Sequence, residues 1–270
     1  MSKSKTTVPQ KVALYGVTGL AGSRICELSP DNFKIIGPPH SHLNLLNIKN
    51  VQKHIKDVNP DKIIYAAGLT KVDDAQRSPE LAFKLNFKIP ASIAKIAKAQ
   101  KIPLLYISTD AIFDGRQCGR PYKESDTPNP LSIYGKSKLA GEQAVIAASK
   151  CNIVVRTIML YSANYPHKKD FARLAYESLK NHENFTAISD QIINPTFVDD
   201  FARAVFSILA KSASGIYHVA ATDYTTNFGF VKKIAKVFKY KKPQISKTYF
   251  DEFFKNKPAP RTKCCWLDTT

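Results

Sequence analysis

The chain has 270 residues, 44% of them hydrophobic, and its 40 Lys and Arg residues against 22 Asp and Glu residues give a formal net charge of +18. This length and apolar content suffice for a full hydrophobic core, so they exclude a chain disordered throughout and collagen-like or mucin-like architectures. No apolar run approaches the roughly 20 residues of a membrane-spanning helix, and the polar start has no apolar stretch of signal-peptide length. We therefore expect a cytoplasmic protein without a membrane partner.

Lysine supplies most of the positive charge, with 32 Lys against 8 Arg. Proteins that read nucleic-acid grooves depend on the bidentate contacts of Arg, and the sequence contains no recognisable nucleic-acid-binding module. We therefore expect no nucleic-acid partner. Residues 231–270 carry a net charge of +8, from ten Lys and one Arg against three acidic residues, and this excess would attract an anionic ligand or partner.

The cysteines indicate neither a disulfide framework nor a zinc site. Their number is odd, none forms a C-x-x-C pair, and no histidine pair lies near them at zinc spacing. We expect reduced thiols throughout, with the adjacent pair near the C-terminus packed in the interior, and we expect no metal. The five residues are Cys26, Cys118, Cys151, Cys264 and Cys265.

The first half of the chain alternates between apolar runs typical of buried strands and segments with helical spacing. This alternation predicts an α/β fold, a Rossmann-like doubly wound parallel sheet with helices on both faces. We expect strands at 12–15, 33–36, 62–67, 103–108 and 152–157, and helices at 23–28, 79–100 and 131–148.

Beyond residue 157 the pattern changes, and no linker of biased composition separates the two halves. We therefore expect a Rossmann domain at 1–157 and a smaller C-terminal lobe at 158–270, packed as one compact body with a ligand cleft between them. In the second half we expect helices at 169–179, 199–209 and 227–238, with short strands at 185–188 and 215–220.

Gly16, Gly19 and Gly22 follow the first expected strand and open the first expected helix. The first glycine would allow a tight turn, the second a close approach of the backbone to a pyrophosphate, and the third close packing of helix against strand. The pyrophosphate would lie at the helix N-terminus, where unpaired amides and the helix dipole favour negative charge. The pattern indicates a dinucleotide site, although the spacing by itself also fits an ordinary glycine-rich turn.

Tyr134 and Lys138 are four residues apart in an expected helix, so they share one face. A neighbouring ammonium favours phenolate, so we expect it to lower the pKa of Tyr134, which suits a proton donor to a carbonyl that receives hydride. Thr109 ends an expected strand, where parallel sheets bind ligands, and its hydroxyl would bond a substrate oxygen. Each feature alone has an ordinary alternative, a surface helix pair for the first two residues and a turn cap for Thr109.

Several motifs, in this order, resemble those of the extended short-chain dehydrogenase/reductases, and more narrowly those of the dTDP-4-dehydrorhamnose reductase family. They are V-D-D-A-Q-R-S-P-E-L-A at 72–82, S-T-D-A-I-F-D-G at 108–115, P-L-S-I-Y-G-K-S-K-L-A-G-E at 130–142 and D-Q-I-I-N-P-T at 190–196. The resemblance implies that NADPH or NADH reduces the C4 ketone of a nucleotide-linked 6-deoxy-4-ketohexose. Residues 1–157 would bind the NAD(P) cofactor, residues 158–270 would bind the nucleotide-sugar substrate, and the assembly would be a homodimer.

The resemblance also implies roles for individual residues. Tyr134 would donate the proton, Lys138 would orient the nicotinamide ribose, and Thr109 would polarise the keto group. The cofactor would contact Gly16, Thr18, Gly19, Leu20, Ala21, Gly22, Asn44, Leu45, Ala67, Gly68, Tyr134 and Lys138. The substrate would contact Thr109, Asp110, Met159, Asn194 and Thr196.

Two features leave alternatives open. Residues 37–42, after the second expected strand, offer neither an acidic residue for a ribose 2′-hydroxyl nor an Arg or Lys for a 2′-phosphate, so both NADH and NADPH stay open. Met159 stands where the family commonly has an aromatic residue, which favours a reductase or epimerase of another nucleotide sugar. A further alternative is a non-catalytic, nucleotide-binding regulatory subunit, because the beta subunit of methionine adenosyltransferase is similar to the same family.

Overall fold

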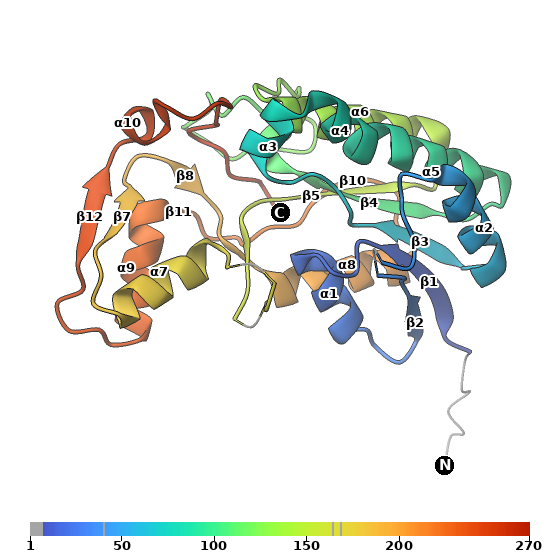
Figure 1. Cartoon of the computed structure of the whole chain (residues 1–270), viewed down its shortest axis with the longest axis horizontal. Coiled ribbons are helices and arrows are strands. Elements are labelled where there is room, and N and C mark those ends of the chain that lie inside the picture. Colours follow the sequence, from blue (N-terminus) through green and yellow to red (C-terminus); the bar gives the residue numbers. More distant parts are fainter. Residues whose placement is uncertain (1–7, 40, 164, 168) are drawn as a thin grey trace, which may run out of the picture.

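The computed structural model describes residues 8–39, 41–163, 165–167 and 169–270. Six parallel strands form its central sheet, in the order β10-β5-β4-β3-β1-β2 (Figure 1). The expected α/β fold with a parallel central sheet is therefore confirmed. The strands are Gln10–Tyr15 (β1), Phe33–Ile36 (β2), Lys62–Tyr65 (β3), Leu104–Thr109 (β4), Ile153–Thr157 (β5) and Gly215–His218 (β10).

Helices cover both faces of this sheet. Successive side chains of a strand point to opposite faces, so β4 supplies two cores, Leu104 and Tyr106 to one and Leu105 and Ile107 to the other. The first core is covered by Ile48–Val58 (α2), Ile89–Ala99 (α5) and Ile133–Ala148 (α6), and the second by Leu20–Glu27 (α1) and Val198–Ala210 (α8).

Within the described ranges, no helix is both long and apolar enough to span a bilayer.

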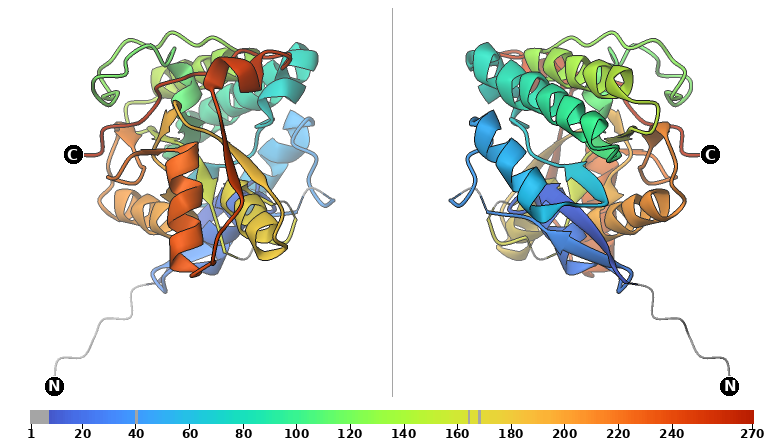
Figure 2. Two further views of the ribbon diagram at one scale, coloured as in Figure 1. Left: turned by 90° about the vertical axis from the view of Figure 1, so that its left-hand side faces the viewer. Right: turned by 90° about the vertical axis from the view of Figure 1, so that its right-hand side faces the viewer.

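A smaller lobe stands at one end of the sheet layer, as the end-on views show (Figure 2). Its main elements are Phe171–Lys180 (α7), Phe185–Ile188 (β7), Asn227–Val237 (α9), Ile245–Thr248 (β12) and Phe250–Phe254 (α10). The strand expected at 185–188 is present, but it pairs with β12 instead of the central sheet. Two short strand pairs complete the lobe: Leu160–Tyr161 (β6) with Thr196–Phe197 (β9), and Ile192–Ile193 (β8) with Thr225–Thr226 (β11).

Two elements from beyond residue 157 belong to the sheet layer. Strand β10 pairs in parallel with β5, and α8 packs beside α1 on one face of the sheet. The second half of the chain therefore contributes to the sheet layer as well as to the smaller lobe. The division of the chain at residue 157 stays a prediction.

The helix expected at 79–100 is interrupted near its middle. Val72–Arg77 (α3) and Pro79–Phe83 (α4) are followed by a π-helical turn at Lys84–Lys88, after which α5 begins. Turns of this kind are rare and frequently lie at functional sites. This one carries Asn86, whose side chain is completely buried.

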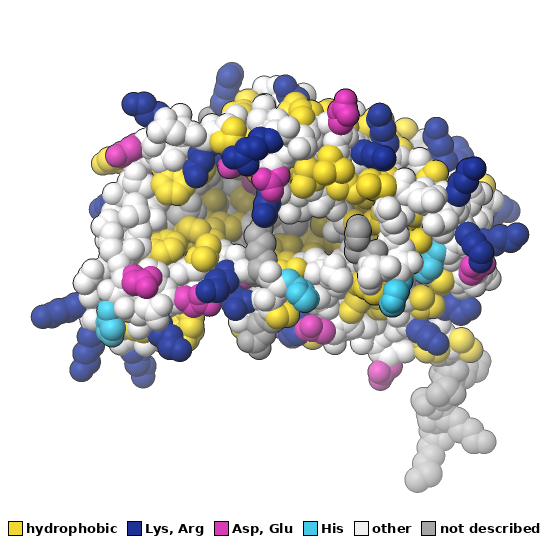
Figure 3. Space-filling model, viewed as in Figure 1, with side chains coloured by type: hydrophobic (Ala, Val, Ile, Leu, Met, Phe, Trp, Pro, Cys, Tyr) yellow, Lys and Arg dark blue, Asp and Glu magenta, His cyan; other side chains and the backbone are white. Residues whose placement is uncertain are grey.

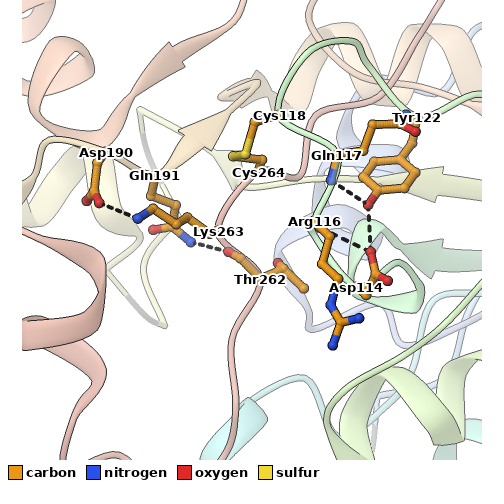
Figure 4. The surroundings of a disulfide bond; sticks show 10 residues. All are labelled: Asp114, Arg116, Gln117, Cys118, Tyr122, Asp190, Gln191, Thr262, Lys263 and Cys264. Atoms are coloured by element: carbon orange, nitrogen blue, oxygen red, sulfur yellow. Dashed lines mark hydrogen bonds and ion pairs between the residues drawn. A yellow bond between two sulfur atoms is a disulfide. The ribbon is translucent and has the colours of Figure 1, made fainter.

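Cys118 and Cys264 form a disulfide bond, so the expectation of reduced thiols at these two positions is wrong (Figure 4). They are 146 residues apart in sequence, and no local spacing connects them. They meet because residues 261–268, which we call the C-terminal segment, return to the loop that follows β4. Cys26, Cys151 and Cys265 are free thiols, and Cys265 is buried as expected.

A buried ion pair joins α6 to β5. The side chains of Glu142 and Arg156 are only 2% and 3% exposed, and Arg156 Nη2 lies 2.8 Å from Glu142 Oε2. Arg156 Nε contacts both carboxylate oxygens, at 3.1 and 3.2 Å. Each side chain therefore neutralises the buried charge of the other.

Glu142→Ala should lower the free energy of unfolding by about 3–5 kcal/mol, because it leaves the Arg156 charge buried without its partner. The double variant Glu142→Leu, Arg156→Met should lose much less, since it removes both charges. Urea denaturation under one fixed redox condition measures both variants. Glu183→Ala, at an exposed glutamate after α7, is the control and should change the value by no more than about 0.5 kcal/mol. If Glu142→Ala lowers the free energy of unfolding no more than the control does, the buried ion pair does not stabilise the fold in this way.

Candidate active site

A cavity of about 990 Å³ lies where the carboxyl ends of the parallel strands meet the smaller lobe. The face drawn in space-filling form is hollowed there, with hydrophobic side chains in the depression (Figure 3). This is where ligands bind in open parallel sheets. The lining comes from residues 15–21, 43–46, 66–68, 107–110, 159–160 and 169–171, with further residues from α6 and β5.

The turn between β1 and α1 requires residues without side chains. Gly16 has a φ of +102°, and a Cβ there would lie 2.6 Å from the backbone nitrogen of Ala67. A Cβ on Gly22 would lie 2.1 Å from the Gly16 carbonyl oxygen, so Gly22 permits the close packing of helix on turn. Helix α1 begins after Gly19 with no side-chain cap and no acidic residue in its first turn. Its N-terminal amides are thus not occupied by a capping side chain, and this end of the cavity fits a pyrophosphate.

The hydroxyl, phenol and ammonium groups expected to take part in the reaction converge at the other end of the cavity. Thr109 ends β4, and its hydroxyl donates to the Asp110 carboxylate at 2.9 Å. Ser132 caps α6 by accepting a hydrogen bond from its first turn, and Tyr134 and Lys138 then project from this helix into the lining. Lys138 Nζ donates to the Ile107 carbonyl at 2.6 Å.

Burial determines the pKa values of these groups. It raises the pKa of Tyr134 to about 12, against the weaker opposing effect of a hydrogen bond with Thr109. It lowers the pKa of Lys138 to about 7 and raises that of Asp110 to about 6. The expectation that Lys138 lowers the pKa of Tyr134 is therefore wrong, because desolvation is the largest effect on the phenol and the ammonium donates to a backbone carbonyl.

Asn86, in the π-helical turn, holds two sides of the cavity together. Its Oδ1 accepts from the Leu69 amide at 2.9 Å, and its Nδ2 donates to Ser137 Oγ at 2.9 Å. Ser137 Oγ in turn donates to the Tyr134 carbonyl at 2.8 Å. The turn after β3 and the first turns of α6 are thereby fixed to each other. Sequence reasoning gave Asn86 no role, and the signal that could have identified it is an amide side chain among apolar helical positions.

Two buried hydroxyls at the strand ends have no hydrogen-bond partner among the described residues. They are Ser108 Oγ on β4 and Thr157 Oγ1 on β5, and both residues line the cavity while being only 4% and 7% exposed. A buried polar group without a partner costs about 1–3 kcal/mol, so both positions fit polar atoms of a bound ligand. Sequence reasoning missed both as ligand contacts, because a hydroxyl at the end of an apolar strand has no local pattern that marks it as ligand-facing.

The structure brings most of the sequence-predicted site residues to this one cavity. Gly22 lies beneath the glycine turn, and Asn194 and Thr196 are not part of the lining. No group of three or more His, Cys, Asp or Glu side chains within the described part of the chain is arranged to hold a metal ion. The predicted residues that line the cavity are Gly16, Thr18, Gly19, Leu20, Ala21, Asn44, Leu45, Ala67, Gly68, Thr109, Asp110, Tyr134, Lys138 and Met159.

Asn194 and Thr196 are buried, and their side chains form hydrogen bonds with other residues of the chain. Asn194 Oδ1 accepts from the Leu267 amide at 2.8 Å, and its Nδ2 donates to the Ala221 carbonyl at 2.9 Å. Thr196 Oγ1 donates to the Asn194 carbonyl at 3.0 Å and accepts from the Ala221 amide at 3.2 Å. These contacts attach the C-terminal segment and the loop after β10 to the smaller lobe.

Tyr165 and residues 169–171 line one side of the cavity, and sequence reasoning did not assign them to the site. The Tyr165 hydroxyl donates to the Thr18 carbonyl at 2.7 Å, which joins Tyr165 to the glycine turn. Asp170 caps α7 by accepting from the Arg173 amide at 3.1 Å, and Lys169 beside it lines the cavity. The helix expected at 169–179 begins at Phe171, and Asp170 before the helical pattern is a local signal that could have located this start.

Comparison with known proteins gives a family match over nearly the whole chain. Residues 10–270 match the family described as RmlD substrate binding domain. A dTDP-4-dehydrorhamnose reductase from Sinorhizobium fredii is 28% identical over 235 residues, which cover 84% of this chain and 78% of the relative. Methionine adenosyltransferase 2 subunit beta from Xenopus tropicalis is 31% identical over 248 residues, which cover 86% of this chain and 73% of the relative.

A solved structure shares the fold closely. The crystal structure of a dTDP-4-dehydrorhamnose reductase from Bacillus anthracis, in complex with NADP, has a TM-score of 0.91 and 30% sequence identity. The match covers 97% of this chain and 92% of that one. With the glycine turn, Thr109, Tyr134 and Lys138 around one cavity and a family match from residue 10 to the last residue, the chain belongs to the RmlD substrate binding domain family.

Proposed function

We propose that this protein reduces the C4 ketone of a nucleotide-linked 6-deoxy-4-ketohexose, with NADPH or NADH as hydride donor. The observation that carries this proposal is the convergence of Thr109, Tyr134 and Lys138 at one end of a cavity whose other end is the glycine turn. The reductases from Sinorhizobium fredii and Bacillus anthracis support the substrate class, and the NADP in the latter supports the cofactor.

The lining fits a dinucleotide laid across the strand ends. The cavity passes the ends of β2, β1, β3, β4 and β5 in turn, which is their order in the sheet. Asn44 and Leu45 would hold the adenosine, the glycine turn the pyrophosphate, and Lys138 the nicotinamide ribose. The hydroxyls of Ser108 and Thr157, which have no hydrogen-bond partner among the described residues, belong to lining residues at the ends of β4 and β5, where the nicotinamide would lie. When bound, the cofactor supplies the hydride.

The protein's own groups would handle the proton. Because its pKa is about 12, Tyr134 is protonated at neutral pH and would hand its proton to the keto oxygen as hydride reaches the carbon. Thr109 would polarise that oxygen by turning its hydroxyl from Asp110 to the substrate. The products are the C4 alcohol and the oxidised nicotinamide.

A non-catalytic regulatory subunit is the second candidate, favoured by the 31% identity to methionine adenosyltransferase 2 subunit beta. Oxidation of NADPH and of NADH with dTDP-4-keto-6-deoxyhexose, generated in situ, separates the two candidates. Turnover would contradict the regulatory candidate, and the ratio of the two rates would establish the cofactor preference. The reductase would be contradicted if the protein binds NADP⁺ but reduces neither this substrate nor GDP- or UDP-linked 4-ketosugars.

We further propose a cytoplasmic location and a homodimer. NAD(P)H and nucleotide sugars are metabolites of that compartment, and symmetric pairs are the commonest protein assemblies. Light scattering of the purified protein should therefore give twice the chain mass of 30.1 kDa. A single-chain mass across micromolar concentrations would contradict the dimer.

Tyr134→Phe should lower kcat by about 10²–10⁴-fold, because it removes the transferable proton and little else. Calorimetry should show an NADP⁺ affinity within about threefold of the wild type, since the ring that lines the cavity is kept. Tyr240→Phe, at a phenol in the smaller lobe outside the cavity, is the matched control and should leave kcat unchanged. Equal turnover in Tyr134→Phe would remove Tyr134 from its role.

Lys138→Met should change how stability depends on pH. The folded state holds the Lys138 proton with a pKa of about 7, whereas the unfolded chain holds it with a pKa near the ordinary 10.5. Between pH 7 and 9 the unfolded wild type binds more protons at this site, so this group makes the free energy of unfolding rise with pH, by up to about 1.4 kcal/mol per unit. Urea titrations at several pH values should show this rise reduced in Lys138→Met. Parallel curves for the two proteins would contradict a depressed pKa.

A further inference from the structure

The C-terminal segment, residues 261–268, forms hydrogen bonds to the loop that follows the reaction centre. The Cys264 amide donates to the Gly115 carbonyl at 3.0 Å, and the Tyr122 amide donates to the Trp266 carbonyl at 2.9 Å. Cys265 Sγ donates to the Asp110 carbonyl at 3.3 Å, directly after Thr109. This side of the segment therefore holds both ends of the loop at 110–122.

The same segment is bound to the smaller lobe. The Ile192 amide donates to the Lys263 carbonyl at 2.9 Å, and the Cys265 amide donates to the Ile192 carbonyl at 3.2 Å. Gln191 Nε2 donates to the Thr262 carbonyl at 2.9 Å, and Lys263 Nζ pairs with Asp190 at 2.7 Å (Figure 4). The C-terminal segment thus lies between the loop after β4 and the lobe and is bonded to both, so it fixes their relative position.

The Cys118–Cys264 disulfide is a covalent bond in this arrangement that a thiol can reduce. Cys118 is exposed on the loop, whereas Cys264 is only 2% exposed beneath it. The loop itself is braced, since the Tyr122 hydroxyl donates to Asp114 at 2.8 Å (Figure 4). Because Cys118 is the exposed partner, we place the attack of a solvent thiolate at Cys118, with Cys264 as the leaving group. Disulfides in reducing compartments are usually transient or redox-sensing, so this one suits a regulatory bond in a cytoplasmic protein.

We propose that the C-terminal segment is a positioning element for the reaction centre, and that the Cys118–Cys264 disulfide makes its attachment depend on the thiol redox state. In the oxidised protein the segment holds the Thr109–Asp110 turn against the lobe. In the reduced protein this hold is weaker, so substrate is bound less well, while the cofactor half of the cavity, built from β1, α1 and β3, is unaffected. The inference rests on the proposed reductase function for its kinetic readout and on the proposed cytoplasmic location for the regulatory role of the disulfide.

The chemical step is an ordinary thiol–disulfide exchange with a dithiol as reductant. A dithiol thiolate attacks Cys118 Sγ, the bond between the two protein sulfurs breaks, and Cys264 leaves as a thiolate that takes up a proton. The second thiol of the reductant then displaces Cys118 and closes its own disulfide. Two electrons and two protons pass from the dithiol to the protein, which ends with two free thiols.

The test compares the whole protein after treatment with glutathione disulfide and after treatment with dithiothreitol, with free thiols counted by mass spectrometry. Reduction should raise the KM for dTDP-4-keto-6-deoxyhexose at least threefold and leave the Kd of NADP⁺ within twofold. Cys118→Ser should behave as the reduced protein under both conditions. Cys151→Ser, at an exposed free cysteine after α6, is the matched control and should keep the full response to dithiothreitol.

Hydrogen–deuterium exchange provides a readout that does not need turnover. Residues 109–122, 190–196 and 261–268 should exchange faster in the reduced protein, and residues 10–37 should not. Absence of the disulfide after oxidation, an unchanged exchange pattern, or equal changes in KM and in the Kd of NADP⁺ would each overturn the proposal. If neither redox state turns over substrate, the reductase function fails while the exchange pattern still decides the role of the segment.

Discussion

The carboxyl ends of the six parallel strands lie at one edge of the sheet, and side chains from distant parts of the sequence meet there. The strand register fixes the level at which these strands end, because Tyr15, Tyr65 and Tyr106 lie side by side on β1, β3 and β4. The segments that continue from these strands leave the sheet at nearly the same level, so Gly16 and Thr109 line a single cavity although more than 90 residues separate them. A slip of one residue in any pairing would turn the lining of that strand to the opposite face. The site therefore depends on strand register before it depends on any single side chain.

Two of these tyrosines, Tyr65 and Tyr106, form hydrogen bonds to backbone carbonyls of the π-helical turn. The Tyr65 hydroxyl donates to the Leu85 carbonyl and the Tyr106 hydroxyl to the Asn86 carbonyl, each at 2.7 Å. Asn86 then binds the turn after β3 and, through Ser137, the start of α6. Helix α6 also approaches very closely, since a Cβ at its Gly141 would lie 2.2 Å from the Asn86 carbonyl oxygen. Tyrosines that look like core residues thus help to position the helix that carries the candidate catalytic pair.

Desolvation, more than neighbouring charge, sets the proton affinities in the cavity. It keeps Tyr134 protonated and brings the pKa of Lys138 to about 7 and that of Asp110 to about 6, so two groups in the cavity have pKa values near neutrality. The same enclosure leaves Ser108 and Thr157 with hydroxyls that no described residue satisfies. A site with these properties is arranged for a ligand that brings its own polar groups and excludes water.

Sequence alone determined the order of strands and helices, the glycine turn, and the spacing of Tyr134 and Lys138, because each of these is a local pattern with a fixed period or a fixed turn chemistry. It also identified part of the cavity lining, through the glycine turn and the motifs that follow strand ends. Only the tertiary structure decided that β10 joins the central sheet, that Asn194 is bonded to the C-terminal segment, and that Cys118 meets Cys264. It likewise reversed the expected pKa direction of Tyr134. These outcomes depend on which distant segments lie together and on how completely they exclude water, and neither quantity is encoded in the spacing of residues along the chain.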